Sequence, residues 1–175
     1  NGVDITCSDN APIYIINADK VFITLKEGTE NTLTDGTEYI QSDDNTVDGV
    51  IFSKADLTLN GSGTLTINGN YKHGILSKDD IVITGGTYNI TAVKDAINGK
   101  DSVKIKDGTF TINASEGNGI QSKNDEDITK GLFKVSDALK DIIPICIFGN
   151  YSAGKSTFIN ALIGYEILPS GGDPV

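Results

Sequence analysis

The chain has 175 residues and contains no methionine, no tryptophan and no arginine. Because an initiator methionine is missing, we interpret the chain as an excised or truncated piece of a longer product. The two cysteines, Cys7 and Cys146, lie in different segments, so we expect no disulfide framework. The longest apolar run, residues 142–148, is far shorter than the roughly 20 residues of a membrane-spanning helix. We therefore expect no transmembrane segment.

Basic residues are also scarce relative to acidic ones. The net charge is −10, and residues 1–130 carry 20 acidic side chains against 11 lysines. Such an acidic segment repels other polyanions, so we expect no nucleic acid partner. The carboxylates would suit divalent cations if they cluster, and would form only the solvated face of a soluble β protein if they do not. Both interpretations are open at this point.

The most informative feature is a pattern that repeats every 22 residues between His73 and Ile112. Further copies extend upstream from Ile51 and downstream from Ile120, and a fainter copy begins at Ile15. A period of 20 to 50 residues indicates stacked units that bury a core only through their neighbours. The best-matched positions are the pairs Ile75 and Ile97, Lys78 and Lys100, Ile81 and Val103, Ile83 and Ile105, Tyr88 and Phe110, and Ile90 and Ile112.

Within each copy, apolar residues recur at every second position, which is the spacing of a β-strand. Gly, Asn and Asp separate three short strands per copy and leave no room for a helix. Consecutive copies must then stack strand on strand, in parallel, about 4.8 Å apart. The sequence therefore predicts a mainly β fold, a parallel β-helix of about five rungs over residues 13–128. Its interior column would hold Ile51, Ile75, Ile97 and Ile120.

Stacking turns two further positions of the repeat into polar columns. A polar column contains Gly49, His73, Asp95 and Asn118, with His73 expected to face solvent; a lysine column contains Lys54, Lys78, Lys100 and Lys123. Beside the lysines runs an acidic strip of Asp56, Asp79, Asp80 and Asp101. Stacked like charges repel, so we expect the acids to interleave with the lysines. The result is either a self-neutralising surface or a Ca²⁺ site, for which the candidates are Asp43, Asp44, Asp48, Asp80, Asp95 and Asp101.

Residues 1–130, with their repeat length, corners and the SKDD and GKDS turns, resemble the bacterial secreted carbohydrate-binding-domain family of β-helix proteins. The resemblance implies a polysaccharide-lyase-like, right-handed β-helix that binds acidic, pectin-like polysaccharide with Ca²⁺. It also implies an extracellular or cell-surface location. The chain has His73 and Asn118 where the family tends to have Asp, whereas Asp95 keeps the match.

The sequence favours a non-catalytic binder over a lyase. The β-helix pectate lyases that this architecture resembles use Ca²⁺ with an Arg or Lys base, and this chain has no Arg. Lys78 and Lys100 could serve, but each is one member of a repeated column, and catalysis usually needs one convergent site. Aromatic platforms for sugars are few: Tyr14, Tyr39, Tyr71 and Tyr88, of which Tyr88 shares a core column with Phe110 and Leu65.

After Lys130 the repeat ends and a different pattern begins. Residues 149–156 match GxxxxGK[ST] between an expected strand, residues 145–148, and an expected helix, residues 155–162. In this motif, backbone N–H groups surround the phosphates, the lysine reaches the β- and γ-phosphates and the serine binds Mg²⁺. The expected nucleotide-binding residues are Gly149, Asn150, Ser152, Ala153, Gly154, Lys155, Ser156, which would also hold Mg²⁺, and Thr157.

Residues 131–175 resemble the opening of a bacterial dynamin-like GTPase, which implies a guanine nucleotide partner and a cytoplasmic location. The switch threonine, the DxxG strand and the NKxD motif of that family are missing, so we expect little GTP hydrolysis. The two segments belong to different compartments and no linker separates them. We interpret the chain as an artificial or mis-assembled fusion with its seam at residues 130–133, the alternative being a natural two-function protein. The tail, residues 131–175, is expected to cap the open end of the β-helix or to be disordered.

Overall fold

The computed structural model describes residues 2–41, 44–124, 130 and 132–135, and this part of the chain is built from β-strands. The strands are β1 (Asp4–Cys7), β2 (Ile13–Ile15), β3 (Lys20–Leu25), β4 (Glu30–Asp35), β5 (Gly49–Ser53), β6 (Asp56–Gly61), β7 (Thr64–Asn68), β8 (His73–Ser77), β9 (Asp80–Ala92), β10 (Ile97–Gly99), β11 (Ser102–Ala114), β12 (Ile120–Ser122) and β13 (Leu132–Val135). Among the described residues, no helix is long and apolar enough to cross a membrane.

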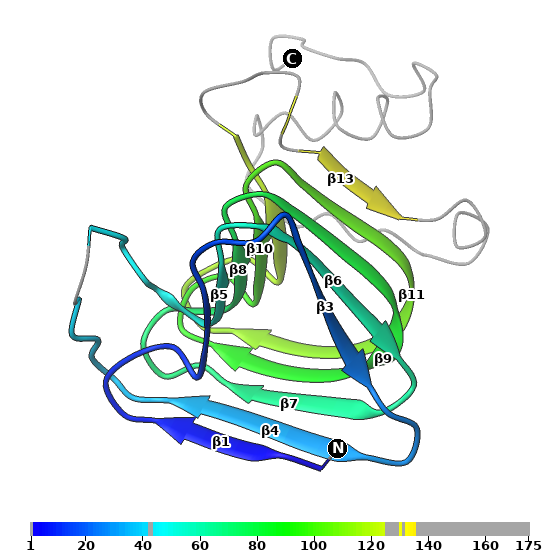
Figure 1. Cartoon of the computed structure of the whole chain (residues 1–175), viewed down its shortest axis with the longest axis horizontal. Helices are drawn as coiled ribbons and strands as arrows, with labels where there is room; N and C mark the ends of the chain where they lie inside the picture. The colour runs from blue at the N-terminus through cyan, green and yellow to red at the C-terminus, as the bar shows by residue number, and fades with distance from the viewer. Residues whose placement is uncertain (1, 42–43, 125–129, 131, 136–175) are drawn as a thin grey trace, which may run out of the picture. The chain divides into compact units, whose positions relative to one another are not determined.

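The strands form a parallel β-solenoid of about five turns (Figure 1). One sheet has the order β12-β10-β8-β5-β2, and every pair in it is parallel. The larger sheet stacks β1-β4-β7-β9-β11-β13; in addition, β6 pairs with the first half of β9 and β3 pairs with β6. The predicted fold class is confirmed, because each copy of the repeat supplies one strand to each stack.

The interior is made of apolar columns that run along the stack. Ile51, Ile75 and Ile97 are completely buried and in register, and Ile120 continues their column as a partly buried residue. This is the column that the repeat predicts. The first copy is shifted, however: Ile13, not Ile15, pairs with Ile51, because Ile15 lies opposite Ser53 at the end of β5. The fainter copy was therefore aligned two residues too late at its start.

Glycines allow the long strands β9 and β11 to turn a corner without ending. Gly86 and Gly108 have φ angles of 106° and 137°, in the region that side-chain-bearing residues rarely adopt. The register between β9 and β11 shifts around Asp107 and then resumes, so that the Tyr88 and Phe110 rings stack with centroids 5.1 Å apart. Tyr88 is completely buried, and its hydroxyl donates to the Gly85 carbonyl. The interior position predicted for Tyr88 is confirmed.

The C-terminal end of the solenoid extends further than the repeat predicts. Strand β13 pairs in register with β11, from Leu132 opposite Ser102 to Val135 opposite Ile105, so the stack continues beyond Lys130.

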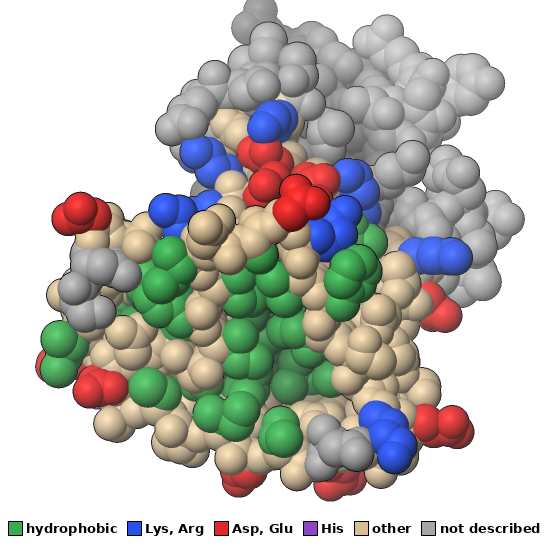
Figure 2. Space-filling model, viewed as in Figure 1, with side chains coloured by type: hydrophobic (Ala, Val, Ile, Leu, Met, Phe, Trp, Pro, Cys, Tyr) green, Lys and Arg blue, Asp and Glu red, His purple; other side chains and the backbone are tan. Residues whose placement is uncertain are grey.

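At the first turn, Figure 2 shows hydrophobic side chains gathered between β3 and β5 and framed by polar atoms. Ile13, Ile15, Val21 and Ile23 pack there against the buried core. The expected strand, phosphate loop, helix and cap of the tail lie outside the described residues.

Candidate functional site

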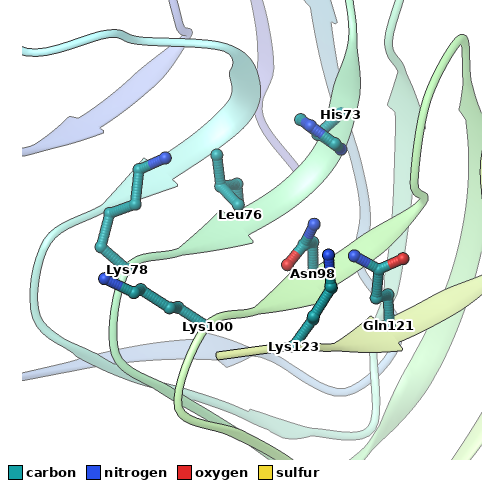
Figure 3. A pocket seen from close by; sticks show the side chains of 7 residues that line it. All are labelled: His73, Leu76, Lys78, Asn98, Lys100, Gln121 and Lys123. Carbon is teal, nitrogen blue, oxygen red and sulfur yellow. The ribbon is translucent and has the colours of Figure 1, made fainter. Parts of the chain in front are cut away.

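The outer face of the five-stranded sheet carries a groove of about 320 Å³. Because side chains alternate along a strand, the residue after each interior isoleucine points outward. Leu76 in β8, Asn98 in β10 and Gln121 in β12 are in register and form the floor. Lysines from the turns after these strands also line the groove, and His73 lies at the start of β8 (Figure 3). We call this site the lysine groove; its lining residues are His73, Leu76, Lys78, Asn98, Lys100, Gln121 and Lys123.

The loop between β4 and β5 covers the outer face of the sheet beside this groove. Phe52 and Leu76 are 1% and 4% exposed, and they pack with Val47 of the loop in a second apolar cluster. The Gln41 side chain closes the loop, since its amide donates to the Val47 carbonyl and accepts from the Val47 N–H. The lysine groove therefore lies on the half of the outer face with the later turns of the solenoid.

Backbone hydrogen bonds fix the spacing of the lysine column. The N–H groups of Lys54, Lys78 and Lys100 donate to the carbonyls of Ile15, Ser53 and Ser77, each one turn earlier. The lysines are thus placed at the separation of parallel strands, about 4.8 Å. This fixes the spacing of the lysine backbones, whereas the long side chains of Lys78, Lys100 and Lys123 direct their ammonium groups in different directions (Figure 3).

At the loop end of the groove, the lysine column meets a carboxylate. Asp48 Oδ1 lies 3.9 Å from Lys78 Nζ, and Asp48 Oδ2 lies 4.0 Å from Lys72 Nζ. Oδ1 is buried, and the described residues offer it no hydrogen bond. Lys54 is bound by the same loop, because its Nζ donates to Asn45 Oδ1 over 2.8 Å. The loop thus engages the first two lysines of the column.

The polar column forms a hydrogen-bonded wall next to the groove. Asp95 is 6% exposed and accepts hydrogen bonds from the Asn98 side chain and from both the backbone and side chain of Asn118. The Asp95 N–H donates to Nδ1 of His73, whose side chain is only 15% exposed. His73 therefore lines the groove but is more buried than the predicted solvent-facing position, because its ring lies against Asp95. Burial lowers the pKa of His73, although Asp48 and Asp95 oppose this effect.

The predicted calcium ligands that the structure describes, Asp44, Asp48, Asp80, Asp95 and Asp101, do not come together. Asp80 binds Ser102 and Lys104, and Asp101 binds Asn124 and Lys130. Asp56 pairs with Lys20, so these three acids reach lysines outside the lysine column. Within the described part of the chain, no three His, Cys, Asp or Glu side chains lie close enough to hold a metal ion. Asp44 is exposed in the loop, and Asp43 lies outside the described residues.

Two carboxyl groups of the acidic strip, Asp79 and Asp80, have pKa values shifted in opposite directions. Burial raises the pKa of Asp79, and the charges of Asp56 and Asp101 act in the same direction. Burial also raises the pKa of Asp80, but hydrogen bonds from Ser102 and Lys104 outweigh it, so the net shift is downward. The strip is thus an unevenly neutralised row of acids.

The predicted aromatic platforms are mostly used within the protein. Tyr14 packs edge-on against Phe52, with ring centroids 5.5 Å apart. Tyr39 and Tyr71 stack on each other at 4.5 Å, and the Tyr39 hydroxyl donates to the buried Asp35. Burial raises the pKa of Asp35, although hydrogen bonds from Asn70 and Tyr39 oppose the shift. The predicted phosphate-loop residues, from Gly149 to Thr157, lie outside the described part of the chain.

Sequence reasoning identified the lysine and polar columns but not the groove between them. Asn98 and Gln121 follow interior isoleucines directly, so their outward orientation could have been read from the alternation. What the sequence does not reveal is that the β4–β5 loop covers Phe52 and leaves Asn98 and Gln121 lining a cavity.

The fold is a parallel β-solenoid with a polar groove on the outer face of one sheet. A family model described as carbohydrate-binding domain-containing protein matches residues 1–143, and the chain belongs to this family. The dynamin family model matches residues 145–175.

Two relatives support the assignment. A carbohydrate-binding domain-containing protein of Acetivibrio thermocellus is 44% identical over 94 residues, which cover 53% of this chain and 33% of that protein. A solved structure of the polysaccharide lyase-like protein from C. thermocellum, a gadolinium derivative, is 39% identical with a TM-score of 0.74. The match covers 77% of this chain and 55% of that one. The chain therefore spans about a third and about half of these two proteins.

Proposed function

We propose that the β-solenoid binds acidic, pectin-like polysaccharide without cleaving it. The observation that carries this proposal is the lysine groove: three lysines line one cavity of a chain whose net charge is −10. Membership in a carbohydrate-binding family supports a saccharide as the ligand. The lysines add a preference for a saccharide that carries carboxylates, and the amides of Asn98 and Gln121 can hydrogen-bond to hydroxyls.

We further propose that calcium contributes by bridging the protein and the polymer. Two polyanions repel each other at long range, and a divalent cation shared between their carboxylates reduces that repulsion. Because the described carboxylates form no complete site, the polymer would supply part of the coordination. Of the predicted calcium ligands that the structure describes, Asp44 is the exposed one and is the candidate for such a bridge, with Asp43 beside it in the sequence.

Retention of the full chain on immobilised polygalacturonate tests the proposal. We expect retention there, little retention on a neutral polysaccharide, and earlier elution when a chelator removes calcium. Retention that a chelator leaves unchanged would remove calcium from the proposal. Equal elution from acidic and neutral polymers would overturn the proposed ligand class. Release of unsaturated products that absorb in the ultraviolet would assign the alternative activity, a polysaccharide lyase.

A further inference from the structure

The floor of the lysine groove carries two amide side chains, Asn98 and Gln121, next to one buried carboxylate. The two amides are in register on the neighbouring strands β10 and β12, about 4.8 Å apart. The carboxylate is that of Asp95, which belongs to the polar column beside the floor. Its hydrogen bonds decide which atoms of the two amides are turned toward the groove.

The orientation of the amides beside Asp95 follows from hydrogen-bond chemistry. An ionised carboxylate accepts hydrogen bonds and cannot donate them, so an amide next to it must turn its NH₂ group toward it. Asn98 Nδ2 donates to Asp95 Oδ2 over 2.6 Å, and Asn118 Nδ2 donates to Asp95 Oδ1 over 3.1 Å. The backbone N–H of Asn118 donates to the same Oδ1 over 2.8 Å. Because hydrogen bonds to a charged acceptor are stronger than neutral ones, both amides are held in one of their two possible orientations.

The orientation of Gln121 depends in turn on Asn118. The Asn118 Nδ2 group also donates to Gln121 Oε1, so both of its N–H bonds are used within the protein. Gln121 must therefore turn its oxygen toward Asn118, and its Nε2 group remains for the groove. In Figure 3 this nitrogen lies on the side of Gln121 that faces Asn98.

The groove floor thus presents one acceptor and one donor with no hydrogen bond to the described part of the chain. These are Asn98 Oδ1 and Gln121 Nε2. A ligand carboxylate can accept from Gln121 but has no proton to donate to Asn98. A hydroxyl can donate or accept, so two adjacent hydroxyls of one sugar match this pair.

We propose that Asn98 Oδ1 and Gln121 Nε2 bind two adjacent ring hydroxyls of a sugar unit, and that Asp95 is the positioning residue that sets this order of acceptor and donor. The inference rests on the proposed function and deepens it, because it names the group of the polysaccharide that the groove floor recognises. This recognition uses hydroxyls and does not depend on the carboxylates of the polymer. A sugar unit with acetylated ring hydroxyls keeps its charge but cannot donate to Asn98.

The test compares the affinities of the full chain for polygalacturonate and for its O-acetylated form, measured by calorimetry at one fixed calcium concentration. The wild type should bind the acetylated polymer about fivefold to tenfold more weakly, since one net hydrogen bond contributes about 1 kcal/mol. Asn98→Ala and Gln121→Ala should each bind polygalacturonate about fivefold more weakly and lose most of this preference. The matched control is Asn113→Ala, which removes an exposed amide of β11 on the other sheet and should leave both affinities within about twofold.

A positioning role for Asp95 predicts a change in preference as well as in affinity. Asp95→Asn replaces an acceptor by an amide that can also donate, so Asn98 can turn over and present its NH₂ group to the groove. The ratio of the two affinities should then fall to within about twofold of one. A merely structural role would weaken the binding of both polymers alike and leave the ratio unchanged. Asn118→Ala removes the contact that orients Gln121 while Asp95 stays in place, and it provides the same comparison if Asp95→Asn does not fold.

The outcomes separate this inference from the proposed function. If the wild type binds acetylated and unacetylated polygalacturonate equally, the inference is wrong, and the proposed function stands provided that both bind better than the fully methyl-esterified polymer. If the charged and methyl-esterified polymers bind equally, the proposed ligand class is wrong, while acetylation still tests the floor. A chain that binds none of these polymers would contradict both proposals.

The variants decide between the floor and other surfaces. Loss of the preference in Asn113→Ala to the same extent as in Asn98→Ala would show that the hydroxyls are recognised elsewhere. A preference that is unchanged in both Asp95→Asn and Asn118→Ala would remove the positioning role. Circular dichroism of each variant confirms that the comparison is between folded proteins.

Discussion

The strands β2, β5, β8, β10 and β12 have one face inside the solenoid and one outside, and the residues on the two faces change differently along the stack. Inside, the register-matched residues are all isoleucine, from Ile13 to Ile120. Outside, they change from aromatic through aliphatic to amide: Tyr14, Phe52, Leu76, Asn98 and Gln121. The outward residues are apolar where the β4–β5 loop packs over them, at Phe52 and Leu76. They are polar where the lysine groove lies over the later strands. The inner face therefore carries the fold, and the outer face is free to carry binding.

The largest effect should come from a charge placed on the inner face. Ile97 is completely buried between Ile75 and Ile120, so Ile97→Asp places a carboxylate where no polar group can solvate it. We expect a loss of at least about 4 kcal/mol in the free energy of unfolding. Urea denaturation followed by circular dichroism measures it. The control is Asn98→Ala, one residue away on the outer face, which should cost only about 1 kcal/mol for its bond to Asp95. Equal losses at the two positions would contradict the division between the faces.

A second comparison lies within the outer face. Phe52→Ala should cost about 3 kcal/mol, because the ring is 1% exposed and packs against Tyr14 under the loop. Gln121→Ala, at the matching position in the groove, should cost about 1 kcal/mol or less. Both side chains point outward, and only Phe52 lies under the loop. Thermal unfolding of the two variants therefore measures how much the loop cover adds to the contribution of an outward residue to stability. Similar melting temperatures for the two variants would mean that the loop does not pack on Phe52 in solution.

The fold was predictable because the interior columns repeat in both residue type and spacing. Ile75 and Ile97 show the same strand in consecutive turns, and Tyr88 and Phe110 show the same corner. The first copy was misaligned because its turn has Ile13 and Ile15 on the same face, and either fits the column. Strand β13 was missed because Leu132–Val135 lies beyond the last recognisable corner glycine.

The candidate site was predictable only in its components. The lysine column was visible in the sequence, because a repeated residue must stack. The partners of the carboxylates were not, since Asp80 binds Lys104 on the adjacent strand and Asp48 reaches Lys72 and Lys78 from a loop outside the repeat. Loop contacts depend on three-dimensional packing that no period encodes. This is also why the burial of His73 was not anticipated.

The smallest expected effect is a pH dependence at the boundary between the two faces. Burial lowers the pKa of His73 below its ordinary 6.5, Asp48 and Asp95 oppose the shift, and Lys78 reinforces it. Lys72 is a further charged neighbour, since its Nζ lies 4.0 Å from Asp48 Oδ2. Because the unfolded chain takes up this proton more readily than the folded one, the contribution of neutral His73 to stability is present above pH 6.5. It is lost as the pH falls from 6.5 through the folded-state pKa.

The measurement is the urea midpoint of the wild type and of His73→Gln at intervals between pH 7.5 and about 5. The wild type should lose stability faster than His73→Gln across this range. Parallel curves for the two proteins would show that His73 does not titrate with a lowered pKa. A steeper curve for His73→Gln would reverse the sign of the shift.

Main-chain hydrogen bonds place one lysine in each successive turn of the solenoid. The lysine column therefore has a fixed interval along the stacking axis. The backbone N–H groups of Lys78 and Lys100 are hydrogen-bonded to carbonyls of the preceding turn, so a substitution can remove a lysine side chain but cannot change the spacing of the positions. Inserting or deleting one complete 22-residue copy would change the number of these positions and leave their interval unchanged. The length of the solenoid can therefore change by whole copies, while the interval between its turns stays fixed by the geometry of the β-sheet.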